Sequence, residues 1–252
     1  IDIAKKAVIV MCADNGVVAE GISQSGQEIT AAVTENLGKR NTSVCKMAKA
    51  VGAEIFPVDI GVNTDRIFPG VISRKVKKGT NDFLLKPAMS EREAMQAVRV
   101  GMELVKECKE AGYSLLGTGE MGIGNTTTSA AMAAALLSVP PEIVAGRGAG
   151  LSDEGLDRKR QVITAALEKY QLRETEPMRI LCSVGGLDIA GLCGVFLGGA
   201  KYHMPIVADG VISAVAALTA ERLCPGTKEF IIPSHKGKEP ASELLMRELG
   251  LS

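Results

Sequence analysis

Short, unbroken hydrophobic runs alternate along this chain with longer segments in which apolar and polar residues repeat at helical spacing. Residues 7–12, 113–116 and 205–208 are continuous apolar runs, each followed by a polar or glycine-rich turn. Runs of this length indicate strands that are buried on both faces of a sheet. The same pattern predicts further strands at residues 53–62, 178–182 and 230–233.

Helical periodicity marks the segments between these runs. Residues 91–110 are the clearest case, because apolar side chains recur there at helical spacing and Ser90 with Glu93 forms a capping box. Residues 63–88 show neither pattern and predict a long excursion with a short hairpin, its basic side chains facing solvent. Pro57 predicts an edge strand or an irregular strand end. Further helices are predicted at residues 27–37, 43–50, 129–137, 153–170, 187–200, 211–222 and 239–249.

The alternation of strand and helix predicts an α/β fold: an open, mainly parallel sheet with helices on both faces, a Rossmann-like arrangement in three layers. The 252 residues, 46% of them hydrophobic, suffice for one large domain, residues 1–252. In such sheets, ligands bind beyond the carboxyl ends of the strands. Polar or glycine-rich residues follow the predicted strands, and we expect them to form one shared site: Asp14 to Gly16, Asp59, residues 117–128, residues 183–186, Asp209 with Gly210, and Ser234 with His235.

The glycine-rich residues 117–128 join an apolar run to an alanine-rich helix. A turn of this kind lets backbone N–H groups approach an anion, and Asn125 or a neighbouring threonine can cap the helix. Glu120 is unexpected beside a phosphate, because like charges repel; it suits a sugar hydroxyl, a cation or a proton in transfer. The stretch lacks the lysine of a Walker loop, and a turn that serves packing alone is the alternative.

Composition excludes several classes of protein. A formal net charge of zero, with no basic run, argues against nucleic acid or a membrane surface as the main partner. No apolar run reaches the ~20 residues that span a bilayer. The six cysteines are scattered and suit a reduced, cytoplasmic protein, and two histidines make a multi-histidine metal site improbable.

A series of motifs extends along nearly the whole chain. The motifs are MCADNGV at residues 11–17, GEMGIGNTT at 119–127, GRGA at 146–149, SVGGLDIAG at 183–191, ADG at 208–210 and IPSH at 232–235. Together they resemble the nicotinate-nucleotide–dimethylbenzimidazole phosphoribosyltransferases, which make the lower-ligand nucleotide of cobalamin. The resemblance implies transfer of phosphoribosyl from nicotinate mononucleotide to 5,6-dimethylbenzimidazole, giving α-ribazole 5'-phosphate and nicotinate. It also implies no metal or cofactor, small-molecule substrates as partners, and a homodimer.

The same resemblance assigns roles to residues at the matching positions. Glu120 is expected near the ribose, where it stabilises the positive charge that develops when nicotinate leaves. The phosphate and nucleotide are expected at Gly122, Gly124, Asn125, Thr126, Gly148, Lys159 and Ser234. The base pocket is expected at Ser25, Gln27 and Met121, and the cleft floor at Asp14, Gly185, Gly186, Asp209 and Gly210.

The chain departs from the family pattern at both ends. The family carries its general-base glutamate in a Gly-Glu-Gly motif that would follow Ser252, and an N-terminal helical segment that would precede Ile1; both are expected to be missing here. Two other functions therefore stay open. The pattern Gly-x-Gly-x-x-Gly at residues 117–122 suggests a dinucleotide-dependent oxidoreductase, and the loss of the glutamate suggests a non-catalytic nucleotide-binding domain.

Overall fold

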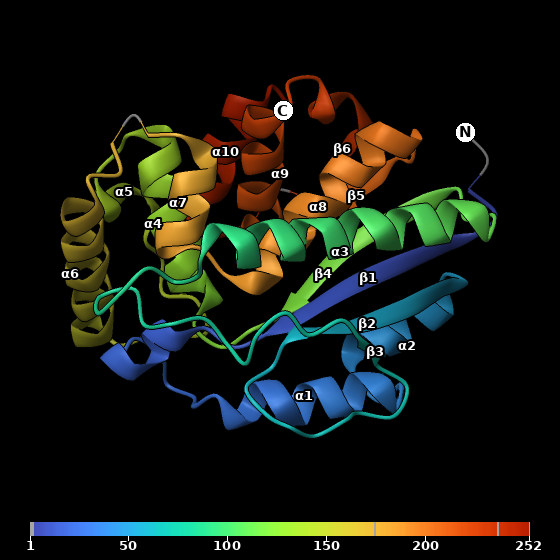
Figure 1. Ribbon diagram of the computed structural model, residues 1–252, viewed down its shortest axis with the longest axis horizontal. Helices are drawn as coiled ribbons and strands as arrows, with labels where there is room; N and C mark the ends of the chain where they lie inside the picture. Colours follow the sequence, from blue (N-terminus) through green and yellow to red (C-terminus); the bar gives the residue numbers. More distant parts are fainter. Residues whose placement is uncertain (1–2, 174, 236, 252) are drawn as a thin grey trace.

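The fold is built on a six-stranded sheet in which every strand pair is parallel, in the order β3-β2-β1-β4-β5-β6 (Figure 1). The computed structural model describes residues 3–173, 175–235 and 237–251. From β1 the chain builds the sheet outward on one side and then returns to build the other side, so the direction changes between β1 and β4. The strands are β1 (Lys6–Ala13), β2 (Ala53–Gly61), β3 (Ile72–Ser73), β4 (Leu115–Met121), β5 (Ile206–Ala208) and β6 (Ile231–Pro233).

Helices cover both faces of this sheet, as the sequence predicted (Figure 1). Helices α1 and α2 pack on one face, whereas α8 and α9 pack on the other, with α3 lying across α8. The helices are α1 (Glu28–Gly38), α2 (Ser43–Ala50), α3 (Glu91–Glu110), α4 (Asn125–Leu137), α5 (Pro141–Val144), α6 (Asp153–Tyr170), α7 (Pro177–Val184), α8 (Leu187–Tyr202), α9 (Val211–Leu223) and α10 (Ala241–Leu249), with 3-10 turns η1 (Gly16–Glu20) and η2 (Thr227–Phe230).

Alternation along β1 explains why its apolar run is continuous. Ile9 and Met11 belong to the large core on the side of α8, and Val10 and Cys12 belong to the smaller core beneath α1 and α2. Successive side chains of a strand point to opposite faces, so a strand covered on both sides needs apolar residues at every position. Among the described residues, no helix is long and apolar enough to cross a membrane.

Two features of the glycine-rich stretch differ from the prediction. Strand β4 extends to Met121, so Gly117 and Gly119 lie inside the strand, and the turn is confined to residues 122–124. Pairing with β1 on one side and β5 on the other outweighs the low strand propensity of glycine. The cap of α4 is Gly124, at φ 92°, and not Asn125 or a threonine; Asn125 is the first helical residue.

Residues 178–182 were also predicted wrongly, since they are helical. Helix α7 begins with Pro177 at its first position, where the missing N–H costs nothing, and it ends at Val184. Ser183 and Val184 therefore end α7, and residues 185–186 connect α7 to α8 instead of following a strand. Eight mostly apolar residues are compatible with either element, and packing against α4, α3 and α9 decides for the helix here.

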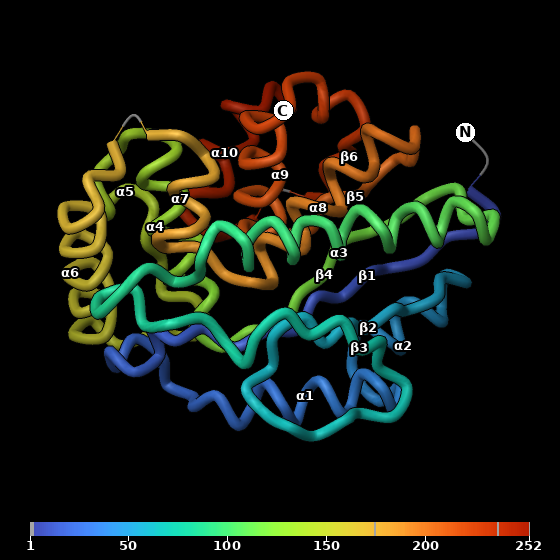
Figure 2. Tube along the Cα trace, viewed as in Figure 1, coloured from blue at the N-terminus to red at the C-terminus, as the bar shows by residue number. Residues whose placement is uncertain are grey.

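The long excursion after β2 contains no hairpin over residues 63–88, all of which the structure describes; its one strand, β3, runs parallel to β2. Strand β3 pairs only with Val58 and Asp59 of β2, so at Pro57 strand β2 pairs with β1 alone. Pro57 therefore lies on an edge of the sheet, as its presence in the strand predicted. Figure 2 shows the excursion continuing to the far end of the molecule, beside α6. There the Tyr170 hydroxyl donates to the Phe83 carbonyl oxygen at 2.8 Å.

Candidate active site

A cavity of about 200 Å³ lies beyond the carboxyl end of β4. Its walls are the end of β4, the glycine turn 122–124, the first residues of α4, and two loops at residues 22–24 and 147–151. The loops are joined by a hydrogen bond of 2.7 Å from the Gln24 side-chain amide to the Gly150 carbonyl oxygen. The cavity therefore lies beside the β1–β4 switch point, where open parallel sheets bind ligands.

Two acidic side chains meet at one end of this cavity. Strand alternation turns Glu120 to the same face as Leu116 and Thr118, toward α8, and Asp188 lies in the first turn of α8. The Asn125 side-chain nitrogen donates to Asp188 Oδ2 at 2.9 Å and also to Glu120 Oε2. A single amide thus bridges the two carboxyl groups.

Both carboxyl groups are shifted toward their neutral forms. The pKa of Glu120 is raised to about 7, chiefly by burial and also by the nearby charges of Asp188 and Asp209, whereas the hydrogen bond from Asn125 lowers it. Burial also raises the pKa of Asp188 to about 6, although hydrogen bonds from Asn125 and from the Ile189 backbone N–H oppose the shift. At neutral pH, then, the pair lies within its titration range, which is typical of groups at catalytic sites.

A buried cation lies beside Thr126, which also lines the cavity. Lys159 is fully buried behind the cavity wall, where its ammonium donates to Thr126 Oγ1 at 3.2 Å and to the Gly146 carbonyl oxygen at 3.0 Å. Burial lowers the pKa of Lys159 to about 8. Gly148, at φ 53°, lies so close that a methyl group there would come within 2.8 Å of Thr126 Oγ1. Three residues predicted to bind phosphate are thus brought together.

Arg147 is a cation that the sequence assignment missed. It lines the cavity, and its guanidinium donates to the Leu151 carbonyl oxygen at 2.8 Å and pairs with Asp153. The GRGA motif contained the signal, because Arg147 stands directly before Gly148 in a glycine-rich stretch that opens a helix. Asp188 was missed as well, although the SVGGLDIAG motif contains it; its partner Asn125 lies 63 residues away.

Other predicted residues lie outside this cavity. Asp209, Gly210 and Ser234 line a neighbouring cavity of about 610 Å³ between the ends of β5 and β6 and helix α10. On the base side, Met121 lines the smaller cavity together with Ser23 and Gln24, whereas Ser25 and Gln27 are not part of its lining. The Gln27 amide instead donates to the Asn15 carbonyl oxygen at 3.1 Å. Gly185 is the C-cap of α7, and Gly186 is the N-cap of α8, two residues before Asp188.

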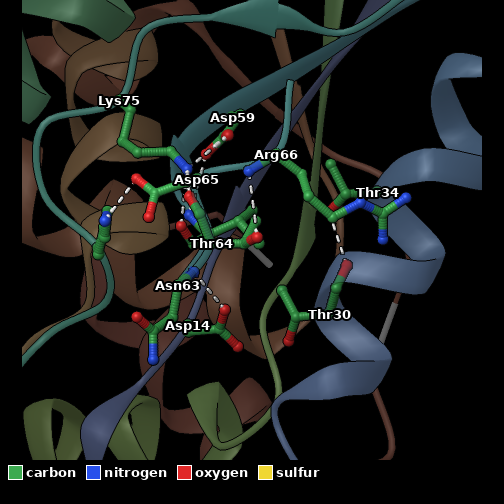
Figure 3. Close-up of polar contacts among 11 residues, drawn as sticks. Asp14, Thr30, Thr34, Asp59, Asn63, Thr64, Asp65, Arg66 and Lys75 are labelled. Atoms are coloured by element: carbon green, nitrogen blue, oxygen red, sulfur yellow. Dashed lines mark hydrogen bonds and ion pairs between the residues drawn. The ribbon is translucent and has the colours of Figure 1, made fainter. Parts of the chain in front are cut away.

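A second polar cluster anchors the loop that follows β2 (Figure 3). Asp14 Oδ2 accepts a hydrogen bond of 2.7 Å from the Asn63 backbone N–H. The Lys75 ammonium lies 3.1 Å from Asp59 Oδ2 and donates to the carbonyl oxygens of Val62 and Thr64 at 2.9 and 2.5 Å. Lys75 therefore holds a loop in place and does not belong to the solvated basic face that the sequence predicted. The cluster is linked to the residues beside the cavity through Asn63. The Asn63 side chain donates to Gln27 Oε1 at 3.2 Å, and Gln27 in turn donates to the Asn15 carbonyl oxygen.

The packing around Glu120 and Asp188 leaves no room for a side chain at Gly122. A methyl group on Gly122 would come within 2.6 Å of both the Ala13 carbonyl oxygen and Asp188 Oδ2. Gly122→Ala should therefore lower the free energy of unfolding by about 1–3 kcal/mol, the usual range for overpacking. Gly210→Ala is the matched control, since a methyl group there meets nothing within 4 Å. Thermal unfolding measures both variants, and equal melting temperatures would contradict this packing.

Burial of Glu120 predicts a pH-dependent stability. Its pKa is raised from 4.5 to about 7, so the native state holds a proton that the unfolded chain releases between these values. The free energy of unfolding should fall as pH rises through this window and level off above it. Glu120→Gln removes the effect, so its gain over the wild type should grow from pH 4.5 to pH 8, reaching about 1–3 kcal/mol.

Urea unfolding at several pH values checks this expectation. Glu103→Gln, on an exposed position of α3, is the control and should show no such trend. A gain from Glu120→Gln that is the same at pH 4.5 and pH 8 would mean that the carboxyl is not desolvated.

Comparison with known proteins places this geometry in a family. The whole chain, residues 1–252, matches the model of a family described as Phosphoribosyltransferase. A protein from Acetivibrio thermocellus is 49% identical over 246 residues, which are 98% of this chain and 70% of that protein. A protein from Clostridium acetobutylicum is 45% identical over 249 residues, 99% of this chain and 71% of that protein. Both are named nicotinate-nucleotide–dimethylbenzimidazole phosphoribosyltransferase.

Solved structures agree with the sequence relatives. The crystal structure of CobT from Thermus thermophilus matches with a TM-score of 0.95 and 36% identity, covering 100% of this chain and 75% of that one. A second structure from the same organism, named for the same transferase, has a TM-score of 0.93. With its parallel sheet, its glycine turn and these relatives, the chain belongs to the nicotinate-nucleotide–dimethylbenzimidazole phosphoribosyltransferase family.

Proposed function

We propose that this chain transfers the phosphoribosyl group of nicotinate mononucleotide to 5,6-dimethylbenzimidazole. The observation that carries the proposal is the polarity of the cavity: Asn125, the first residue of α4, contacts the acidic pair, and Thr126, the second, contacts the buried ammonium. A substrate with an anionic phosphate and a ribose that becomes cationic fits this arrangement, the phosphate near the ammonium and the ribose near the acidic pair. The relatives bear the name of this transferase, so neither an oxidoreductase nor a non-catalytic domain is favoured.

The reaction exchanges one carbon–nitrogen bond for another. The bond between the anomeric carbon and the pyridinium nitrogen breaks, and its electron pair leaves with nicotinate. A benzimidazole nitrogen uses its lone pair to form the new bond from the opposite face, and the proton on the other ring nitrogen is released. The products are α-ribazole 5'-phosphate, nicotinate and a proton. Positive charge on the ribose is greatest in the transition state, so a fixed carboxylate beside it lowers the barrier.

The phosphate fits near the buried ammonium. Helix α4 begins directly after Gly124, and the dipole at its N-terminus favours an anion. Arg147 adds a guanidinium in the cavity wall, and Lys159 adds a positive charge behind Thr126. The ribose then faces Glu120, and the base lies toward Met121 and the loop that contains Ser25 and Gln27. Asp209, Gly210 and Ser234 line the neighbouring cavity.

We also infer that the protein works in the cytoplasm as a homodimer. All six cysteines are free, which suits a reducing compartment. Met47 on α2 and Val51, the C-cap of this helix, stand one turn apart and are 70% and 61% exposed, an apolar surface that a second copy can cover. Sedimentation equilibrium measures the oligomeric state.

A direct assay tests the function. The purified protein is incubated with nicotinate mononucleotide and dimethylbenzimidazole, and products are followed by mass spectrometry, with NMR to assign the anomeric configuration. We expect α-ribazole 5'-phosphate and nicotinate in equal amounts. Absence of both products from folded protein would overturn the proposal.

Lys159 should supply charge to phosphate binding. Lys159→Met keeps most of the buried volume but loses the charge, so nicotinate mononucleotide should bind about 1.5–3 kcal/mol more weakly. Because the pKa of Lys159 is about 8, affinity of the wild type should also fall as pH rises above that value, and the variant should lose this dependence. Calorimetry measures both, with the exposed Lys46→Met on α2 as control. Unchanged affinity in Lys159→Met would remove the residue from the phosphate site.

Glu120 should act on the transition state more than on binding. Glu120→Gln keeps the hydrogen bond with Asn125 but loses the negative charge, so kcat should fall by about 10²-fold with a smaller change in KM for the nucleotide. Steady-state kinetics at pH 8, where the wild-type carboxyl is ionised, provide the comparison. A raised KM with normal kcat would instead make Glu120 a residue for substrate binding alone.

A further inference from the structure

Behind Glu120 lies a second acid that has no direct access to the cavity. Asp188 is 0% exposed and is not part of the cavity wall, whereas Glu120 lines the cavity. Asp188 occupies the first turn of α8, where the helix dipole favours a negative charge, and the Ile189 backbone N–H donates to its Oδ1 at 3.0 Å. Asp188 therefore cannot contact a substrate directly.

Asn125 provides the connection. Its side-chain nitrogen carries two hydrogens, and the two carboxyl groups accept from that nitrogen, one on each side. If the Asn125 amide were flipped, its oxygen would face the oxygens of two carboxyl groups and would repel them. The two carboxyl groups therefore fix the orientation of the amide. Asn125 cannot rotate without breaking its bond to Asp188, and Glu120 is held by the same amide.

Close backbone contacts keep Asp188 itself from moving. A methyl group on Gly186 would overlap Asp188 Oδ1, and one on Gly122 would come within 2.6 Å of Oδ2. Asn15, also fully buried, packs against the same carboxyl, and Thr128 donates to Asn15 Oδ1 at 3.3 Å. Glycines on two sides and a buried amide thus leave the carboxyl one position.

We propose that Asp188 is a positioning residue for the transfer reaction: through its hydrogen bond with Asn125 it fixes Glu120 at the cavity wall. This inference rests on the proposed function of the site. The groups that face Glu120 come from each element packed against it. They are Asp188 from α8, Asn125 from α4, Asp209 after β5, the Cys12 thiol from β1, and Arg147, which lines the same cavity.

These groups predict the direction of each effect. The charges of Asp188 and Asp209 disfavour a second negative charge and so raise the pKa of Glu120, whereas the hydrogen bond from Asn125 lowers it. The Cys12 thiol is neutral, since burial raises its pKa to about 12. Asp188→Asn and Asn125→Ala should therefore move the ionisation of Glu120 in opposite directions, which a loss of packing alone would not do.

The experiment measures kcat against pH for these two variants, with Asp157→Asn on the exposed side of α6 as control. Activity of the wild type should fall on the acid side as Glu120 is protonated. In Asp188→Asn this acid limb should move about one pH unit lower; in Asn125→Ala it should move higher, with kcat reduced at every pH. KM for the nucleotide should change less than kcat in Asp188→Asn, and the control should match the wild type.

A second measurement does not depend on activity. Carbon-13 labelling of glutamate side chains allows the carboxyl of Glu120 to be titrated by NMR, its signal identified by its absence in Glu120→Gln. A lower titration midpoint in Asp188→Asn supports the inference. An unchanged midpoint, or shifts of the same sign in both variants, overturns it. If the midpoints move as expected but the wild type makes no product, the proposed function fails and the coupling between the two acids stands.

Discussion

The pairing of β1 with β4 at the centre of the sheet is the constraint on which the site depends. The register sets Met11 opposite Glu120 and Cys12 opposite Met121, so the two strands end side by side. The residues after them, Asp14 and Asn15 on one strand and the turn 122–124 on the other, must then share a small volume. Gly122 meets this requirement, because a side chain there would collide with the Ala13 carbonyl oxygen and with Asp188. The positions of Glu120 and of the first residues of α4 depend on this close approach between Gly122 and the end of β1.

The first turn of α4 separates charges of opposite sign over two consecutive residues. Asn125 faces two acids, and Thr126 faces a buried ammonium. Burying each of these charges costs free energy. This cost is why the pKa values of Glu120 and Asp188 are raised and that of Lys159 is lowered in the free protein. A substrate that brings a phosphate to one end and positive charge to the other relieves both. In the proposed reaction, binding energy is thus directed at the charge that appears on the ribose.

The buried acidic pair lowers the stability of the fold. Burying Glu120 and Asp188 a short distance apart weakens the fold at neutral pH, since the ionised forms repel each other and have lost water. Support comes from the surroundings: α3 and α8 pack so closely that a methyl group at Gly194 would overlap the Val98 carbonyl oxygen, and Lys75 holds the loop after β2 by three oxygen contacts. A rigid frame of this kind keeps the acids in place although they disfavour each other.

The sequence by itself determined the elements whose signals are local. Helix α3 has the predicted bounds, because its capping box and apolar spacing lie within its own residues, and α6 begins after Ser152 for the same reason. The parallel sheet followed from apolar runs, and the family from motifs spread along the chain. Only the tertiary structure decided that residues 117–121 form a strand, that 178–182 form a helix, and that Asp188 meets Asn125. Those outcomes depend on partners far away in the chain: Gly119 is held by Val10 in β1, and the amide of Asn125 reaches an acid 63 residues later. Contacts of that separation leave no periodic trace in a sequence, since they are fixed by how the strands and helices pack.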